Sequence, residues 1–344
     1  MTIRQPSSGG GFSPTFSSLY ATATSLSAPS HVCRELPDAP VGYDHQLPIG
    51  APGKVGFLYA TVAAARGKSV IAERMAKAPL VLMNPLYTDM QRPETPVLYI
   101  MSTGAGLAQN DRQLVDIRVG GEEPASALIT TQAATPIHRM DVGMAVQHVT
   151  MTVSAGSVLE YIPDHVVPYG GSRSHLSLEA IVSSGGCAIV SDCVTAGRLG
   201  RGERHSYDVL SMETQISQRL RVSSGHNGLF RNRVRPLARD RGVFSPHTGG
   251  GLVGMRNFGA WANVWIIAPS SASTLSVLEA VRELPTPASS GTLRWAASTL
   301  PYESGVWVRI LSATAEEARE ARDAVWTTAR MVLLGASAPR LRKY

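Results

Sequence analysis

The chain has 344 residues, a formal net charge of +6 and a hydrophobic content of 44%. At roughly 150 residues per domain, this length allows one large domain or two smaller ones, and no run of about 18 uncharged apolar residues indicates a membrane-spanning helix. Only 17% of the residues are charged, whereas there are 32 glycines and 22 prolines. This composition favours short strands and turns over long solvated helices.

Arginine carries nearly all of the positive charge, because lysine occurs at only four positions. A sequence pI of about 9.4 indicates acidic partners, which are either nucleic acid or acidic protein surfaces. The three cysteines, Cys33, Cys187 and Cys193, form no CxxC pair, so neither a disulfide framework nor a zinc ribbon is indicated. We therefore expect a reducing, cytoplasmic setting.

The N-terminal segment is rich in Ser, Thr, Pro and Gly, and it has no acidic residue before Glu35. Such a composition predicts little fixed structure. From Lys54 onward the sequence changes to short apolar runs separated by turn residues. We expect a flexible tail over residues 1–52 and a single β-rich domain over residues 53–344.

Short segments that are β-branched or that alternate in polarity predict the strands. In the segment 113–119, for example, Val115, Ile117 and Val119 share one face, as in a half-buried antiparallel strand. Because the connections are short, we expect a large, sandwich-like and mostly antiparallel fold. The predicted strands are 55–65, 69–75, 97–102, 113–119, 127–131, 146–153, 158–162, 176–182, 188–195, 207–213, 218–222, 261–267, 292–297 and 306–311.

Two helices are predicted near the C-terminus. The segment 273–284 has Leu278, Val281 and Leu284 at helical spacing and ends before a proline. The second helix starts at the capping box that begins with Thr314 and ends at Gly335. We expect both helices to pack on the β-rich body.

The sequence contains no catalytic motif of a common enzyme class. The segment 170–174 fails the G-x-S-x-G pattern at its last position, and there is no H-E-x-x-H and no phosphate-binding loop. Asp192 precedes Cys193 and Asp164 precedes His165, but adjacent strand residues point to opposite faces, so each pair supplies at most one ligand to a given point. A closed structural metal site is therefore not indicated.

Five arginines cluster late in the chain, at positions 231, 233, 235, 239 and 241. A solvated loop or a protein interface suits this cluster, because arginine is enriched at interfaces. The alternative is a basic nucleic-acid-binding module. Few aromatic residues interleave with the arginines, which weakens that alternative.

An ordered series of motifs then resembles the UreD (UreH) family of urease accessory proteins. The segment 98–111, LYIMSTGAGLAQND, resembles the glycine-rich GGxVGGD turn of that family, and 128–139, LITTQAATPIHR, resembles its TTxxATKxYR segment. The segment 159–164, LEYIPD, resembles LEWLPQE, and 191–203 resembles WExLCLGRxxxGE. Together with a C-terminal Pro-Arg, the resemblance covers most of residues 54–344.

This resemblance implies a non-enzymatic scaffold and metallochaperone for urease maturation. Such a protein links apo-urease to UreF-type and UreG-type partners, with no membrane and no nucleic acid involved. It has no permanently bound cofactor and carries nickel as transient cargo. The resemblance places Asp111, Thr135, Glu160 and Asp192 on a nickel path, and we predict partner contacts at four arginines, namely Arg139, Arg231, Arg233 and Arg235.

The sequence also departs from the family pattern. The Gly-Gly pairs of the first motif are replaced by Ala105-Gly106 and Gln109-Asn110. Where family members often carry a glutamate before an arginine on a later strand, this chain has Asn232-Arg233. The resemblance therefore leaves that position of the nickel path without a carboxylate.

Overall fold

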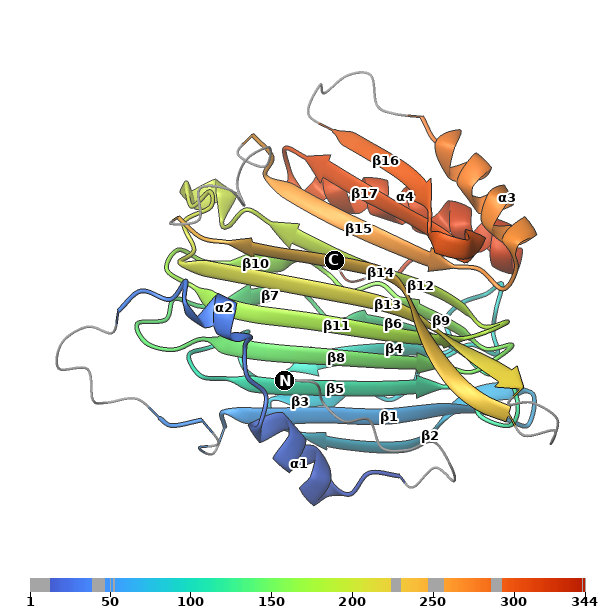
Figure 1. The fold of residues 1–344 in the computed structure, drawn as a ribbon, viewed down its shortest axis with the longest axis horizontal. Coiled ribbons are helices and arrows are strands. Elements are labelled where there is room, and N and C mark those ends of the chain that lie inside the picture. The colour runs from blue at the N-terminus through green and yellow to red at the C-terminus, as the bar shows by residue number, and fades with distance from the viewer. Residues whose placement is uncertain are drawn as a thin grey trace.

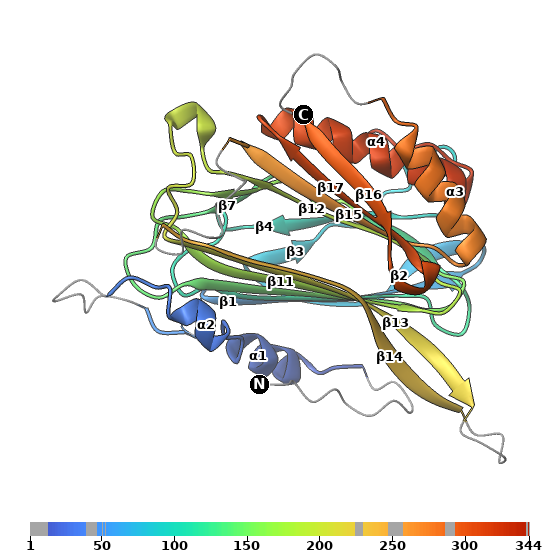
Figure 2. The same cartoon turned by 45° about the horizontal axis from the view of Figure 1, so that its top comes forward.

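The computed structural model describes residues 13–38, 47–49, 51, 53–223, 230–246, 257–285, 293–341 and 343. Within these residues, two β-sheets face each other, and a pair of helices covers the outer side of each sheet (Figures 1 and 2). The expected β-rich class is confirmed. The arrangement of the strands differs from the prediction.

Sheet A contains seven strands, and its two edges are β14 and β2. From one edge to the other it consists of β14 (Phe230–Phe244), β13 (Val209–Ser223), β11 (Arg173–Ser183), β8 (Ala145–Val153), β5 (Arg112–Val119), β1 (Val55–Ala65) and β2 (Lys68–Lys77).

Sheet B contains ten strands. Its main path runs through β16 (Arg294–Thr299), β17 (Gly305–Ser312), β15 (Ala260–Ile267), β12 (Cys187–Thr195), β9 (Val158–Tyr161), β6 (Ser126–Thr131), β4 (Val97–Ser102) and β3 (Leu80–Leu82), with β10 (Val166–Pro168) beside β12 and β7 (Thr135–Ile137) beside β10.

The prediction of mostly antiparallel sheets was wrong, because both sheets are mixed. In sheet A, β1, β5, β8, β11 and β13 are parallel neighbours, and only the outer pairs are antiparallel. The centre of sheet B is also parallel, from β4 through β6 and β9 to β12. In the middle of the chain the strands alternate between the sheets, as from β4 to β5 and from β11 to β12, so these short connections lead to the opposite sheet. Consecutive strands that pair as antiparallel neighbours, such as β1 and β2, lie at the edges of the sheets. A strand of one sheet thus serves as the crossover for two parallel strands of the other.

The main hydrophobic core lies between the two sheets. Alternate residues point inward, such as Val115 and Ile117 on β5 and Val149 on β8, and they meet Ile129 and Val190 of sheet B. This is the alternation that the sequence predicted for the segment 113–119. Each strand contributes one apolar face to the shared core, which aligns the two sheets.

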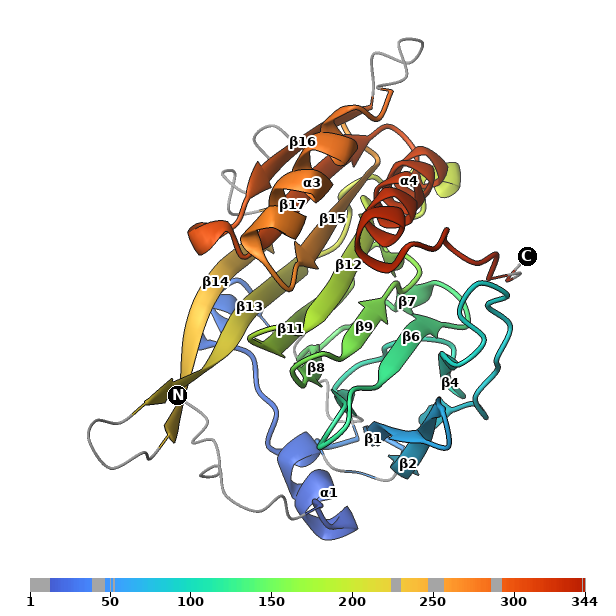
Figure 3. The same cartoon turned by 90° about the vertical axis from the view of Figure 1, so that its right-hand side faces the viewer.

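Helices α3 (Ser271–Arg282) and α4 (Ala315–Leu334) cover the outer face of sheet B (Figure 3). As the sequence predicted, the Thr314 side chain accepts a hydrogen bond from the Glu317 amide, and Gly335 ends α4 in a left-handed conformation. The buried face of α4 includes Trp326 and Ala329. A second hydrophobic core therefore lies between this helix pair and sheet B.

Two further helices lie in the segment expected to have little fixed structure, and for their residues that expectation was wrong. Helix α1 (Phe16–Thr24) begins with a reciprocal capping box between Thr15 and Ser18 and packs Leu19 against β1. The short helix α2 (Ser30–Cys33) buries Val32 against β8 and β13. Apolar residues spaced within a polar composition are enough to fix these helices on sheet A.

Other differences concern local elements. The arginine cluster is not in a loop, because all five arginines lie on β14, and β13 is one long strand where two were predicted. Two short 3-10 turns, at Leu199–Arg201 and Pro301–Glu303, were also not predicted. No helix in the described part of the chain is long and apolar enough to cross a membrane.

Candidate functional site

A cavity of about 310 Å³ lies between the two sheets. On the side of sheet A its wall includes Gln113 of β5 and Gln147 of β8, and on the side of sheet B it includes Tyr161 of β9 and Asp192 of β12. The wall combines apolar side chains, such as Val115 and Leu176, with polar groups from both sheets. Such a wall is typical of sites that hold a small ligand or ion.

The four motifs that resemble the UreD family meet around this cavity. The first contributes Gly104 and Gly106, the second Thr135, the third Tyr161 and the fourth Asp192. These residues span almost ninety positions of the sequence, but their segments are brought together by the parallel pairing of β4, β6, β9 and β12 and by that of β7 with β10 and of β10 with β12. The motif series therefore marks one place in the structure.

The glycine-rich turn is held against the second motif. The Leu107 amide donates to the Pro136 carbonyl at 2.8 Å. Gly106 adopts φ +127°, and a Cβ atom there would lie 2.2 Å from the same carbonyl oxygen. Of the residues in this turn, Gly106 thus has both a conformational and a steric reason to be glycine.

Three carboxylate residues line the cavity, namely Asp164, Asp192 and Glu213. Asp164 pairs with Lys343 at 3.1 Å and Glu213 pairs with Arg239, whereas Asp192 has no ion-pair partner among the described residues.

Asp192 lies on the inner face of β12, and among the described residues its hydrogen bonds come from Asn263, whose backbone amide and side-chain Nδ2 both donate to Oδ1 at 3.0 Å. Burial raises the pKa of Asp192 to about 7; the bonds from Asn263 oppose this rise and the nearby Asp240 carboxylate adds to it. Near neutral pH, this carboxyl group exchanges between its charged and neutral forms.

Asn263 connects Asp192 to the protein surface. Its Nδ2 lies 3.5 Å from Oδ2 of Asp240, and its Oδ1 accepts hydrogen bonds from Arg309 Nε at 3.0 Å and Trp307 Nε1 at 3.1 Å. Arg309 also pairs with Asp240, and about half of the Arg309 side chain is exposed. A chain of polar contacts therefore runs from the cavity to Asp240 of β14 and Arg309 of β17, where it reaches the surface.

Other polar groups of the wall have incomplete hydrogen bonding or a suppressed charge. Gln147 donates to Gln113 Oε1 at 2.9 Å, whereas the buried Gln113 Nε2 has no hydrogen-bond partner among the described residues. Burial raises the pKa of Tyr161 above its ordinary value and raises that of Cys193 to about 12. The Cys193 side chain lies on the other face of β12, in the core beneath α3 and α4, and its thiol stays protonated at neutral pH, a form that is a poor metal ligand.

Glu160, which the resemblance places on the nickel path, lies on the other face of β9 and points toward α4. Its Oε2 is 2.8 Å from Nε of Arg330 and accepts a hydrogen bond from Trp326 Nε1 at 2.6 Å. All three side chains are buried. Glu160 is thus separated from the cavity by the sheet and belongs to a different polar cluster.

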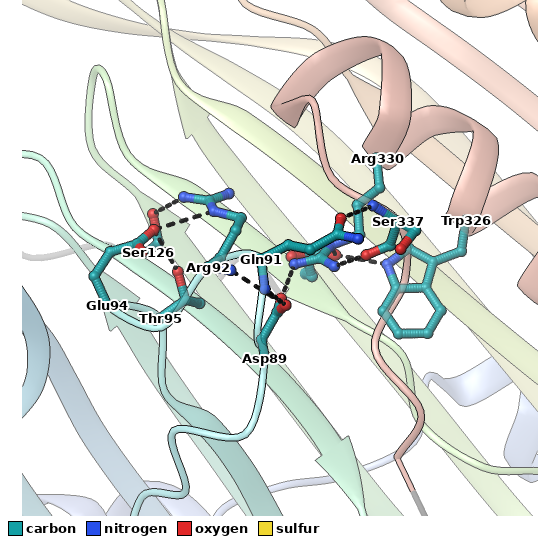
Figure 4. A network of polar contacts seen from close by, with 10 residues as sticks. Asp89, Gln91, Arg92, Glu94, Thr95, Ser126, Trp326, Arg330 and Ser337 are labelled. Atoms are coloured by element: carbon teal, nitrogen blue, oxygen red, sulfur yellow. Dashed lines mark hydrogen bonds and ion pairs between the residues drawn. The ribbon is translucent and has the colours of Figure 1, made fainter.

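That cluster fastens α4 to the loop before β4 (Figure 4). Arg330 also pairs with Asp89 and donates to the Ser337 carbonyl, while the Ser337 amide donates to Gln91 at 2.6 Å. The Asp89 carboxylate additionally accepts from the Arg92 amide at 3.2 Å. The buried guanidinium of Arg330 therefore balances the charges of two carboxylates and connects three segments of the chain.

The remaining predicted residues lie elsewhere. Asp111 accepts a hydrogen bond from the Ala108 amide at 2.8 Å and pairs with Lys54 at 3.3 Å, so it closes the glycine-rich turn outside the cavity wall. Arg139 is largely exposed and pairs with Asp141. Arg231 and Arg233 are exposed on β14, and Arg235 is half-buried. Of the four proposed nickel-path residues, the structure brings only Thr135 and Asp192 to the same cavity.

Three participants of the chain of polar contacts from Asp192 were missed by sequence reasoning, namely Asn263, Asp240 and Arg309. Asn232, where the family pattern places a carboxylate, is exposed near the tip of β14, whereas Asp240, eight residues later and also followed by an arginine, faces Asn263. Asn263 has no local motif, since it lies 71 positions from its partner Asp192. Only the pairing of β12 with β15 reveals it.

The described residues contain no group of three or more His, Cys, Asp or Glu side chains that could hold a metal ion. Comparison with known proteins identifies the family. A family model described as UreD urease accessory protein matches residues 54–343.

The chain belongs to the UreD family of urease accessory proteins.

Individual relatives extend this match over most of the chain. A urease accessory protein UreD 2 of Streptomyces griseus is 37% identical over 86% of this chain and 96% of its own length. A urease accessory protein UreD of Haloarcula marismortui is 32% identical over 87% and 94%, and a UreD 2 of Brucella suis is 30% identical over 86% and 93%. The family described by these names is one of accessory proteins.

Proposed function

We propose that this UreD-family chain is a scaffold of the urease maturation complex, which links apo-urease to UreF-type and UreG-type proteins in the cytoplasm and helps to deliver nickel. The observation that carries the proposal is the convergence of four family-like motifs on one cavity whose wall includes the Asp192 carboxylate. The chain needs no permanently bound cofactor for this function, because nickel is its cargo.

The donor chemistry of the cavity suits transient passage of a divalent ion. Asp192, Thr135 and Gln113 offer carboxylate, hydroxyl and amide oxygens, which hold nickel less tightly than imidazole or thiolate does. A cavity of this volume has room for several water molecules. A nickel ion can therefore pass with much of its hydration shell retained and with few bonds to break on release.

The protonation equilibrium of Asp192 limits how tightly the cavity binds a nickel ion. A carboxyl group whose pKa lies near 7 is ionised in only part of the molecules at neutral pH. A permanently ionised and unpaired carboxylate in this position would retain a divalent cation, whereas a neutral group would not attract it. We therefore assign to Asp192 the role of a weak, exchangeable ligand, supported by Thr135.

Co-purification tests the scaffold role. The full-length chain is co-expressed with apo-urease and with the UreF-type and UreG-type proteins of the same organism, and the complex is isolated through a tag on this chain. We expect all of these proteins to co-elute, and urease activity to be lost in a strain that lacks the gene. Absence of any complex, together with undiminished urease activity in the deletion strain, would contradict the proposal.

A further inference from the structure

Strands β13 and β14 extend beyond the rest of sheet A. The pairing of β13 with β11 ends at Arg219, opposite Ser183. Residues 220–223 of β13 pair only with residues 230–233 of β14, and the two strands project from the body as a ribbon (Figures 2 and 3). We call residues 218–223 and 230–235 the arginine ribbon.

The arginine ribbon carries five positive charges and no acidic residue. Its arginines are at positions 219, 221, 231, 233 and 235. Arg219, Arg231 and Arg233 have no ion-pair partner among the described residues, and the side chains of Arg231 and Arg233 are exposed. Similar arginines closer to the body do find carboxylates, since Arg239 on the same strand pairs with Glu213. The ribbon therefore presents charge that the described part of the chain does not neutralise.

Apolar side chains lie between these arginines. Residues directly opposite each other in an antiparallel pair share a face, so Val222 lies beside Arg231 and Leu220 beside Arg233 on one face, while Val234 lies beside Arg219 on the other. Val222 and Val234 are each more than 40% exposed. Guanidinium groups next to exposed aliphatic side chains are a combination typical of protein interfaces.

The base of the ribbon is fixed to sheet B. The guanidinium of Arg235 stacks on the Tyr302 ring, 3.9 Å from its centroid, and donates to Gln218 Oε1 at 2.5 Å. Tyr302 belongs to the turn between β16 and β17. This contact between the two sheets holds the ribbon in place before any partner binds, which lowers the entropic cost of binding.

We propose that the arginine ribbon docks onto an acidic surface of a partner protein. Arginine binds carboxylates through two parallel hydrogen bonds, and Val222 and Leu220, which share a face with Arg231 and Arg233, bury apolar area at the same contact. A nucleic acid is a poorer occupant, because the sequence of the ribbon contains one aromatic residue, Phe230, and no lysine, which is too few for a base-stacking platform. The proposal rests on the proposed scaffold function, since it identifies the chemistry of one partner contact.

A charge-neutralising double variant tests the proposal. The full-length chain carrying Arg231→Ser and Arg233→Ser is compared with the wild type for binding to purified apo-urease and, separately, to the UreF-type protein of the same organism, at 50 and 300 mM NaCl. For one of the two we expect at least tenfold weaker binding at low salt and a smaller loss of affinity with added salt. Val222→Ser should weaken the same binding severalfold without changing its salt dependence.

The matched control is the double variant Arg201→Ser and Arg204→Ser. These arginines are exposed in the loop before β13, at the opposite end of that strand from the ribbon tip. We expect this variant to bind like the wild type. Circular dichroism and thermal unfolding of both variants establish that the exposed substitutions leave the fold unchanged.

The outcomes separate the two proposals. If the wild-type chain binds its partners and the ribbon variant binds equally well, the docking inference is wrong and the scaffold function stands. If the wild type binds neither protein, the scaffold function is wrong, and the inference falls with it. Binding of the wild type to a 20-base-pair DNA duplex at 150 mM NaCl, lost in the ribbon variant, would assign the ribbon to nucleic acid and overturn the proposal.

Discussion

Two carboxylates on opposite faces of sheet B have opposite surroundings, since Glu160 is fully buried and Asp192 is partly accessible from the cavity. Glu160 lies beneath α4 against the guanidinium of Arg330 and the indole of Trp326. Asp192 lies in the cavity wall, and its hydrogen bonds come from the neutral amides of Asn263. A buried charge with a fixed counter-charge holds segments together, whereas one without such a partner stays available for protons and cations.

This difference assigns separate roles to the two clusters. The Arg330 cluster includes Asp89 before β4 and Ser337 after α4, so it connects distant parts of the chain. The Asp192 cluster reaches the surface through Asp240 and Arg309. We therefore interpret the first cluster as structural and the second as the site of cargo exchange.

The largest expected effect is on folding, from removal of the shared cation. Arg330→Ala leaves Asp89 and Glu160 buried without their counter-charge, which should lower the free energy of unfolding by about 3–5 kcal/mol. Urea denaturation of the full-length chain measures this loss. The exposed Arg201→Ala serves as control and should change stability by less than about 0.5 kcal/mol. A similarly small effect of Arg330→Ala on the free energy of unfolding would contradict the structural role of the cluster.

The second effect is a pH dependence that distinguishes Asp192. Its pKa in the folded state, about 7, lies above the unfolded value near 4. The folded chain therefore binds the extra proton, and stability is highest at low pH and falls as the pH rises through the folded pKa. Between pH 5 and pH 8 this group should account for a decline of about 3 kcal/mol.

Asp192→Asn should remove that part of the decline in stability. Urea denaturation of the variant and the wild type at pH 5 and at pH 8 measures the difference. An unchanged slope in the variant would show that Asp192 is already ionised at pH 5.

The smallest effect sharpens the contrast between the two carboxylates. Glu160→Gln keeps the shape of the side chain but leaves Arg330 with Asp89 as its one anionic partner, so we expect a loss of about 1–3 kcal/mol. Asp192→Asn, the same change of carboxylate to amide, should leave stability at pH 8 unchanged or increased. Equal losses in both variants would contradict the distinction.

The sequence predicted local secondary structure well but did not predict which strands pair with each other. The alternation in 113–119 and the caps at Thr314 and Gly335 are signals that neighbouring residues carry by themselves, and β5 and α4 follow them. Parallel pairing depends on where the chain goes between strands, which a short connection does not reveal. A hairpin was therefore expected wherever the chain in fact crosses to the other sheet.

The same limit applies to the site. Thr135 and Asp192 could be found because they lie in motifs that resemble a family, and both line the cavity. Glu160 lies in such a motif too, but the residue parity of β9 turns it toward α4. Asn263, Asp240 and Arg309 have no motif, because their relation to Asp192 comes from strand pairing and from packing between the sheets.

The most direct test of the account is the nickel content of urease matured with Asp192→Asn. Equal amounts of complex containing this variant, Glu160→Gln or the wild type are supplied with nickel, and nickel per urease active site is measured by atomic absorption. We predict a severalfold decrease for Asp192→Asn with the complex intact, and a wild-type value for Glu160→Gln once the folded amount is equalised. A wild-type nickel content with Asp192→Asn would contradict the central claim that this cavity carboxylate passes the metal.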